Sequence, residues 1–127
     1  MNQLVWIAAG GAAGSVGRFL LAHEVYRRFG AGFPWGTLAV NVLGSLAIGV
    51  IYMLVHEREW GGDFARLFLL VGLLGGFTTF STFSIETVNL LLTGEWLKAV
   101  LNMLGSVLTC VAAAALGVWL ARSLWAA

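Results

Sequence analysis

The chain has 127 residues, of which 60% are hydrophobic and 10% are charged, whereas soluble domains are about 45–50% apolar and about 25% charged. This composition excludes an ordinary soluble protein and predicts a protein embedded in a lipid bilayer. The formal net charge of +1, without a run of Lys and Arg, also argues against nucleic acid as a partner, because neutralising phosphates requires clustered positive charge.

The hydropathy pattern predicts an all-α membrane protein with four transmembrane helices in a single domain, residues 1–127. A helix needs about 20 predominantly apolar residues to cross a bilayer, and four such runs account for nearly the whole chain. The first run has no Lys or Arg before its apolar segment, so we expect a retained helix and not a cleaved signal peptide. The expected spans are about 4–26, 35–55, 64–92 and 96–123.

Local signals mark the ends of the first two spans. The first span contains Arg18 and ends in the polar cluster of residues 23–28. The only proline, Pro34, precedes Trp35, and this pair is typical of a helix that starts at the membrane interface. Residues 56–66 carry charges of both signs around a Gly-Gly turn, so the third span is expected to begin near Phe64.

The third span is predicted to be a helix broken near its middle. Residues 64–92 are too long for a simple perpendicular span at about 1.5 Å per residue, and Gly72, Gly75 and Gly76 interrupt them. We expect the regular backbone to be lost at the double glycine. Backbone groups freed there are tolerated in a membrane only where they are buried in protein or line a cavity.

Three phenylalanines and six hydroxyl residues share the stretch LLGGFTTFSTFSIET, residues 73–87. On a continuous helix, the spacing of Phe77, Phe80 and Phe83 places them on one stripe. Packing against lipid explains such a stripe, and hydroxyl groups in membrane helices often bond the carbonyl four residues back. The concentration of both residue types just after the glycines is more typical of an ion site at a discontinuous helix.

The turn TGEW leads into the fourth span, which contains the only cysteine, Cys110. A single cysteine excludes an intrachain disulfide, and no Cys/His cluster suggests a zinc site. Tryptophans are expected mostly at the ends of spans, because their amphipathic rings prefer the headgroup region. They are Trp6, Trp35, Trp60, Trp96, Trp119 and Trp125.

Loop charge sets no orientation for the chain in the membrane. With four spans, three Lys or Arg residues lie on each side, and Arg18 changes the balance only to three against four. One interpretation is a weakly biased protein that other factors orient. The other is dual topology, in which copies insert both ways and pair as an antiparallel homodimer. The positive residues on one side of the membrane are Arg58, Arg66 and Arg122, and those on the other side are Arg27, Arg28 and Lys98.

Small residues form a face on each of the first two helices. Such faces allow close packing, either between neighbouring helices of one chain, which we favour for any one pair, or across a dimer interface. The dimer prediction therefore rests on charge balance and on size, because four helices leave little interior space for a pathway. The faces consist of Gly10, Gly14 and Gly17, and of Gly44, Ser45 and Gly49.

Two polar side chains are expected inside the membrane. Asn41 lies roughly 9 Å into the second span at 1.5 Å per residue, so it faces protein or a water-filled cavity. An intramembrane carboxylate costs about 2.5 kcal/mol or more, so Glu86 needs a partner, and Arg18 is one candidate. The alternative for Asn41 is an ordinary interhelical hydrogen bond, worth about 0.6 kcal/mol.

The predicted break in the third span suits the binding of either a cation or an anion. Free carbonyl groups coordinate a hard cation, as discontinuous transporter helices coordinate sodium. Hydroxyl and amide protons instead solvate an anion, and the edges of phenylalanine rings carry positive charge. Carboxylate, sulfate or phosphate recognition calls for Arg forks, and this interior has only Arg18. An anion bound here is therefore expected to be small and hard.

Three stretches resemble the family of small fluoride channels called Fluc, also known as CrcB. They are GGAAGSVGRF, PWGTLAVN and GLLGGFTTFSTFSIE, and the resemblance covers essentially the whole chain. It implies an antiparallel dual-topology homodimer with two pores in the bacterial inner (plasma) membrane. Passive export of fluoride through this channel would lower cytoplasmic fluoride and give fluoride resistance. The implied partners are fluoride, membrane lipid and a second copy of the chain.

The resemblance also implies roles for individual residues. Asn41 would donate to fluoride, and Phe80 and Phe83 would present ring edges along the pore. Backbone carbonyls of Gly75 and Thr78 would bind a structural sodium ion on the two-fold axis. Cys110 stands where the family often has serine, so its role is open. The remaining polar track would include Ser81, Thr82, Glu86, Asn102 and Ser106, with Arg18 near a vestibule.

Two other functions compete with the channel. A proton-coupled small multidrug exporter is similarly short, but its resemblance leads us to expect a glutamate within the first helix, where this chain carries Arg18. A noncatalytic assembly or regulatory membrane subunit is the other. An enzyme is not expected, because the loops show no nucleophile beside a base and no metal-ligand spacing.

Overall fold

The computed structural model describes residues 2–124, and this part of the chain is entirely helical outside its connections. Trp125, one of the tryptophans expected at a span end, lies outside the described residues. The elements are α1 (Asn2–Phe29), α2 (Trp35–Arg58), the π-helix η1 (Phe64–Leu74), α3 (Gly75–Phe77), α4 (Phe80–Leu92) and α5 (Trp96–Leu124).

Four helical segments are long and apolar enough to cross a membrane, and this prediction is confirmed. Three of them are α1, α2 and α5, and the remaining one is the segment Phe64–Leu92, which comprises η1, α3 and α4. Both α1 and α2 continue past the ends expected from apolarity, because the polar residues that follow each apolar run stay helical. The chain is an integral membrane protein.

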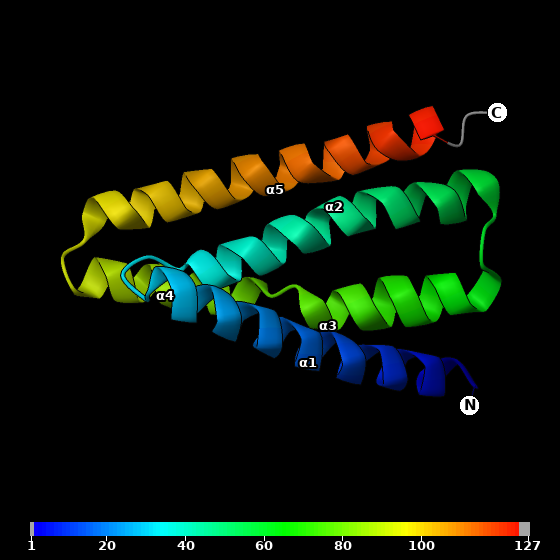
Figure 1. The fold of residues 1–127 in the computed structure, drawn as a ribbon, viewed down its shortest axis with the longest axis horizontal. Coiled ribbons are helices and arrows are strands. Elements are labelled where there is room, and N and C mark those ends of the chain that lie inside the picture. The colour runs from blue at the N-terminus through cyan, green and yellow to red at the C-terminus, as the bar shows by residue number, and fades with distance from the viewer. Residues whose placement is uncertain (1, 125–127) are drawn as a thin grey trace.

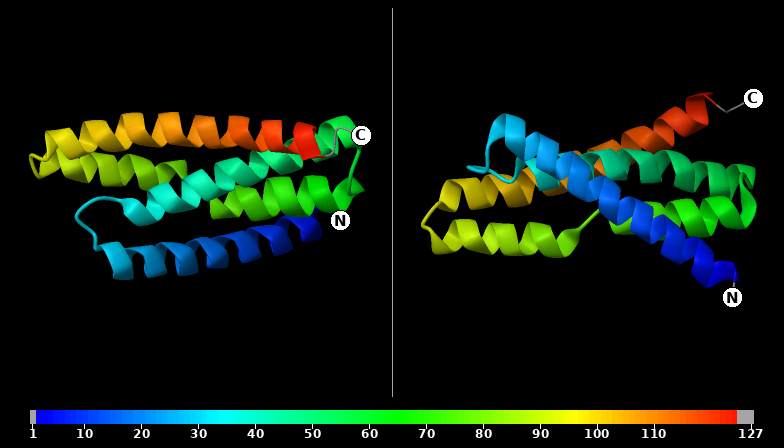
Figure 2. Two further views of the ribbon diagram at one scale, coloured as in Figure 1. Left: turned by 45° about the horizontal axis from the view of Figure 1, so that its top comes forward. Right: turned by 60° about the horizontal axis from the view of Figure 1, so that its bottom comes forward.

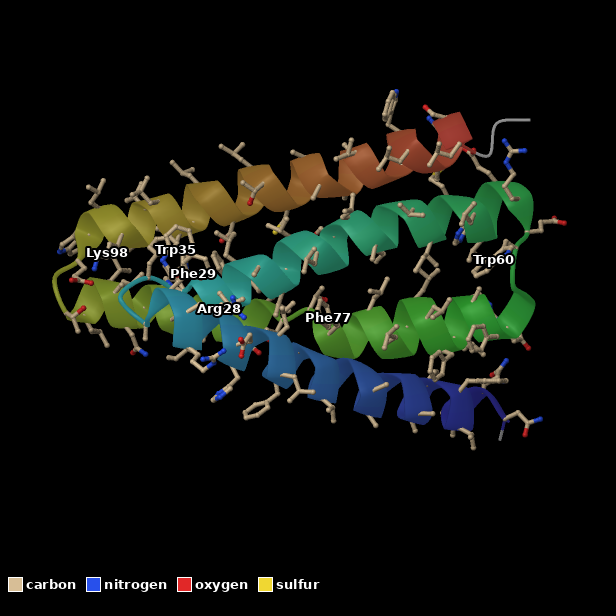
Figure 3. All side chains as sticks on the ribbon, viewed as in Figure 1. Arg28, Phe29, Trp35, Trp60, Phe77 and Lys98 are labelled. Carbon is tan, nitrogen blue, oxygen red and sulfur yellow. The ribbon has the colours of Figure 1, made fainter. Side chains whose placement is uncertain are left out.

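The helices run alternately up and down, so that the connections gather at two ends (Figure 1). The two termini and the α2–η1 connection lie at one end, and the α1–α2 and α4–α5 connections lie at the other. Further views show α1 crossing the remaining helices at an angle (Figure 2). Trp35 and Lys98 lie at one end and Trp60 at the other (Figure 3), which places these amphipathic and charged groups where headgroups would lie.

Glycines bring the helices of one chain into close contact. A Cβ atom at Gly14 would lie 2.1 Å from the carbonyl oxygen of Leu73, so α1 touches the backbone of η1 there. Gly49 of α2 similarly faces α5, where its Cβ would lie 2.2 Å from the carbonyl oxygen of Ala114. The favoured alternative, close packing between helices of one chain, is therefore confirmed at Gly14 and at Gly49. No dimer motif is required to explain these two glycines.

The backbone of the third span leaves helical geometry at Thr78 and Thr79, between α3 and α4. Their φ and ψ angles are −87° and 154°, and −151° and 117°, which are extended values. Gly75 is helical, with φ −62° and ψ −38°, so the extended residues follow the glycines instead of including them. Gly76 has a packing role, because its Cβ would lie 2.7 Å from the carbonyl oxygen of Gly11.

Helix α4 begins with a side-chain cap. Thr79 Oγ1 accepts a hydrogen bond from the N–H group of Thr82 over 3.3 Å, which satisfies one of the free donors in the first turn of α4. The two extended residues also separate Phe77, in α3, from Phe80 and Phe83, in α4. The three rings therefore do not form the stripe that a continuous helix would give.

Candidate functional site

A pocket of about 390 Å³ lies where the extended residues face α2 and α5. We call it the central pocket. Asn41 from α2 and Ser106 from α5 line it together with the segment that connects α3 to α4. Most of its lining is apolar. From the third span, the lining includes Gly75, Thr78, Thr79, Phe80 and Phe83.

Asn41 is bound to the main chain of Thr79 by two hydrogen bonds. The N–H group of Thr79 donates to Asn41 Oδ1 over 3.0 Å, and Asn41 Nδ2 donates to the carbonyl oxygen of Thr79 over 3.2 Å. The side chain thus pairs with the Thr79 N–H, which the extended backbone leaves out of helical hydrogen bonding, and with the carbonyl oxygen of the same N-cap residue. Asn41 makes the interhelical contact expected of a polar residue at this depth, and it also lines the pocket.

Phe80 and Phe83 form the aromatic part of the central pocket. Their ring centroids are 5.4 Å apart and their planes are tilted by 40°. Phe80 is 77% exposed, whereas Phe83 is partly buried, so the pocket reaches the outer surface of the single chain at Phe80. Phe77 lies elsewhere, near Gly17 and Gly44 in the space between α1 and α2.

Ser106 belongs to a buried chain of hydrogen bonds between α4 and α5. Its Oγ donates to Asn102 Oδ1 over 3.3 Å, and Asn102 Nδ2 donates to Thr87 Oγ1 over 2.8 Å. Thr87 in turn donates to the carbonyl oxygen of Phe83 over 2.7 Å. Asn102 is only 2% exposed and does not line the central pocket. Its contact with the pocket is therefore indirect, through Ser106.

Glu86 lies beside a second pocket, of about 480 Å³, at the end of the bundle that contains Lys98. Thr37 Oγ1 donates to Glu86 Oε1 over 2.5 Å, and the Tyr26 hydroxyl donates to Glu86 Oε2 over 2.8 Å. Two hydroxyl donors thus satisfy the carboxylate inside the bundle. Lys98 and Tyr26 both line this second pocket, which we call the end pocket.

Arg18 does not serve as the partner of Glu86. Its Nε donates to the carbonyl oxygen of Gly76 over 3.3 Å, and no ion pair joins Arg18 to a carboxylate among residues 2–124. The guanidinium group therefore lies beside the main chain just before the extended residues. The hydrogen bond to Gly76 tethers α1 to α3 at that point.

Ser81 and Thr82 are placed beside the central pocket and not on its lining. Both side chains contact the hydroxyl group of Thr79, at 3.3 Å for Ser81 and 3.1 Å for Thr82. They form a small hydroxyl cluster around the first turn of α4. Cys110 does line the central pocket, one helical turn after Ser106.

Two main-chain oxygens beside the central pocket suit a hard cation. Within residues 2–124, no hydrogen bond is made to the carbonyl oxygen of Gly75 or of Thr78, and both residues line the pocket. Carbonyl oxygens freed by a discontinuous helix are the kind of ligand that sodium takes in membrane proteins. The residues present therefore fit the cation that the resemblance implies. No group of three metal-binding His, Cys, Asp or Glu side chains occurs in this part of the chain.

Four residues that line these pockets or contact the predicted site residues were not singled out from the sequence. Thr37 precedes Asn41 by four residues, so their position on one face of α2 was a usable signal. No such signal pointed to the Tyr26 contact, because Tyr26 is 60 positions from Glu86 in the chain. The missed residues are Tyr26, Thr37, Thr79 and Thr87.

The fold and site together define a small four-helix membrane protein with a mostly apolar pocket, which contains a few polar groups, at an interruption of its third span. A sequence model of the family described as CrcB-like protein, Camphor Resistance (CrcB), matches residues 5–118. The chain belongs to this family, which confirms the resemblance found in its motifs.

Proteins named fluoride-specific ion channel FluC are similar to the chain over nearly its full length. The one from Magnetococcus marinus is 51% identical over 120 residues, which cover 94% of this chain and 98% of the relative. The one from Hydrogenovibrio crunogenus is 50% identical, with 92% and 89% covered. The one from Geobacter sulfurreducens is 48% identical, with 98% and 100% covered.

Proposed function

We propose that the chain forms a fluoride-selective ion channel that lets fluoride leave the cell passively through the bacterial inner membrane. The observation that carries the proposal is the central pocket, where an amide donor, a hydroxyl and two phenylalanine rings meet inside the bundle of a chain about 50% identical to fluoride-specific channels. A channel of this kind breaks no covalent bond, so the protein is not an enzyme.

Each group on the pocket has a role that its chemistry supports. The second hydrogen of Asn41 Nδ2 replaces part of the hydration shell of fluoride, and the Ser106 hydroxyl adds a donor when it rotates away from Asn102 Oδ1. Phe80 and Phe83 supply ring edges with positive partial charge, which attract an anion without binding it strongly. A pathway must bind an ion well enough to admit it and weakly enough to release it. Mixed donors and ring edges meet both requirements.

The remaining polar residues extend this path from the break toward the end of the bundle that contains Lys98. Glu86 and the end pocket lie on one side of the central pocket, and Asn102 connects the α4 backbone to Ser106. Arg18 provides positive charge near the break, which favours an approaching anion. Ser81 and Thr82 add hydroxyl groups around Thr79.

Export by such a channel requires no energy input. Hydrogen fluoride is neutral and crosses membranes, and it dissociates in an interior that is less acidic than the outside. The fluoride ion is then trapped, because a small charged ion does not cross hydrocarbon. A selective passive conduit lowers cytoplasmic fluoride and thereby gives fluoride resistance.

We propose further that the working unit is an antiparallel, dual-topology homodimer. The equal charge of the two ends supports insertion in both directions. The exposure of Phe80 at the mouth of the central pocket supports a second copy as its cover, since the polar groups in that pocket would otherwise face lipid. A tag on the C-terminus should be detected on both sides of the membrane in cells. A single fixed location would rule out dual topology.

Sodium is proposed as a structural ion held by the backbone carbonyls of Gly75 and Thr78, to which a second copy would add its own pair. A bound sodium ion would supply positive charge that stabilises oxygens left unpaired by the extended backbone. Changes to neighbouring side chains are not expected to remove these ligands, because they belong to the main chain.

Growth assays separate this function from the small multidrug exporter. Expression should rescue a fluoride-sensitive bacterium from fluoride and should give no resistance to lipophilic cations. Membership of the CrcB-like family favours the same outcome. Resistance to lipophilic cations alone would contradict the proposal.

A further inference from the structure

We propose that Thr79 is a positioning residue whose main chain orients the Asn41 amide, so that an N–H group is offered to an anion in the central pocket. The inference rests on the proposed function, in which Asn41 is a fluoride donor. If it is correct, the extended backbone at Thr79 has a role in ion binding that the lining of the central pocket alone does not show.

The orientation depends on two main-chain groups of Thr79, the N-cap residue of α4, and a continuous helix would not expose the N–H of this pair. In a regular helix, the N–H group of residue 79 would bond the carbonyl of Gly75. Here it donates instead to Asn41 Oδ1 over 3.0 Å, while the carbonyl oxygen of Thr79 accepts from Asn41 Nδ2 over 3.2 Å. The extended conformation of Thr79, with φ −151° and ψ 117°, makes both groups available to α2.

The reverse orientation of the amide is chemically excluded. Rotating the Asn41 amide by half a turn would set its NH₂ group against the N–H of Thr79 and its oxygen against the carbonyl of Thr79. Two hydrogen bonds would then become two repulsive contacts. The positions of the nitrogen and oxygen atoms of the Asn41 amide are therefore fixed by the hydrogen bonds to the N–H and C=O groups of Thr79.

This arrangement leaves a donor available at the pocket. Asn41 Nδ2 carries two hydrogens, and within residues 2–124 only the bond to Thr79 uses one of them. An amide free to rotate would also present its oxygen, which repels an anion. Because the N–H donor is already oriented before the ion arrives, ion binding does not cost the free energy of reorienting the amide. Thr79 thus acts on selectivity through Asn41 and not by contact with the ion.

Amide-to-ester replacement at Thr79 tests the proposal directly. The α-hydroxy acid analogue of threonine removes the N–H donor and keeps the side chain that caps α4. The matched control is the same replacement at Val88, a 43% exposed residue of α4 that lines neither pocket. We expect the Thr79 ester to lower fluoride efflux from liposomes about five- to tenfold relative to the Val88 ester, as loss of one hydrogen bond implies.

A second measurement links the effect to Asn41. In the unmodified protein, the Asn41 N–H that donates to the Thr79 carbonyl should exchange slowly in solid-state NMR. The Thr79 ester keeps that carbonyl but loses the N–H that holds the amide in one orientation, so this proton should exchange faster. Equal efflux for the two esters would overturn the proposal. Reduced efflux with unchanged exchange at Asn41 would also overturn it, because the effect would then run through the weakened carbonyl of Thr78. Absence of efflux from the unmodified protein would instead refute the proposed function.

Discussion

The hydroxyl oxygen of Thr37 lies 2.5 Å from a carboxylate oxygen of Glu86, which joins α2 to α4 although the two residues are 49 positions apart. Tyr26 donates to the other carboxylate oxygen from α1. Three of the four spans therefore meet at one acidic side chain. Hydrogen bonds to charged groups contribute about 1.5–3 kcal/mol, so this contact is a substantial part of what holds that end of the bundle together.

Replacing Thr37 by valine should lower the free energy of unfolding by about 1.5–3 kcal/mol, because the shape is kept and one donor to Glu86 is lost. Unfolding in detergent measures the change. Thr109→Val is the control, since the Thr109 hydroxyl bonds the carbonyl oxygen of Gly105 in its own helix over 2.5 Å. Equal stability of the two variants would show that the contact between Thr37 and Glu86 contributes nothing.

Asn102 and Thr87 should be energetically coupled. Their 2.8 Å hydrogen bond joins α5 to α4 in a buried position, and such bonds in membrane proteins contribute about 0.6 kcal/mol on average and about 1.7 kcal/mol at most. A double-mutant cycle with Asn102→Ala and Thr87→Val should return a coupling within that range. The same cycle with Thr109→Val in place of Thr87→Val should return about zero. A zero value for both cycles would contradict the assigned contact.

Neighbouring glycines in α1 should respond very differently to an added methyl group. A Cβ at Gly10 would lie 2.3 Å from the main-chain oxygen of Phe68, whereas a Cβ at Gly11 would meet nothing within 4 Å. Gly10→Ala is therefore expected to destabilise the protein by about 1–3 kcal/mol or more through overpacking. Gly11→Ala should be close to neutral. Thermal unfolding of both variants decides whether α1 packs on η1 as described.

The aromatic part of the pocket has its own test. Phe80→Ile and Phe83→Ile remove the positive ring edges and keep apolar bulk, so each should abolish fluoride efflux from liposomes while the proposed dimer stays intact on size-exclusion chromatography. Phe19→Ile is a control on the outer face of α1, where Phe19 is 64% exposed. If both pocket variants release fluoride at the rate of the unmodified protein, the ring edges of Phe80 and Phe83 have no role in conduction.

Composition and hydropathy were sufficient to predict the four membrane-spanning helices, because the bilayer demands long apolar segments with internal hydrogen bonds. The interruption was expected at the double glycine, whereas the extended residues are Thr78 and Thr79. The glycines serve close packing, as the contact of Gly76 with Gly11 shows. The side chain that pairs with the extended backbone is Asn41, which lies 38 positions away in the chain.

The candidate site was predictable in its residue types more than in its contacts. Asn41, which its depth singled out, lines one pocket with Phe80 and Phe83, whereas Phe77, the first of the three spaced phenylalanines, does not line it. The partners of Glu86 did not follow from the sequence, since charge alone favoured Arg18, whereas the fold places two neutral hydroxyl groups within reach. Such contacts depend on the crossing of α1 over the other helices, which no local pattern encodes.

The decisive measurement is fluoride efflux from liposomes that contain only this purified protein. Fluoride should leave rapidly down its gradient when a potassium ionophore balances the charge, with far slower release of chloride under the same conditions. Liposomes that retain fluoride, or that release chloride equally fast, would contradict a fluoride-selective channel.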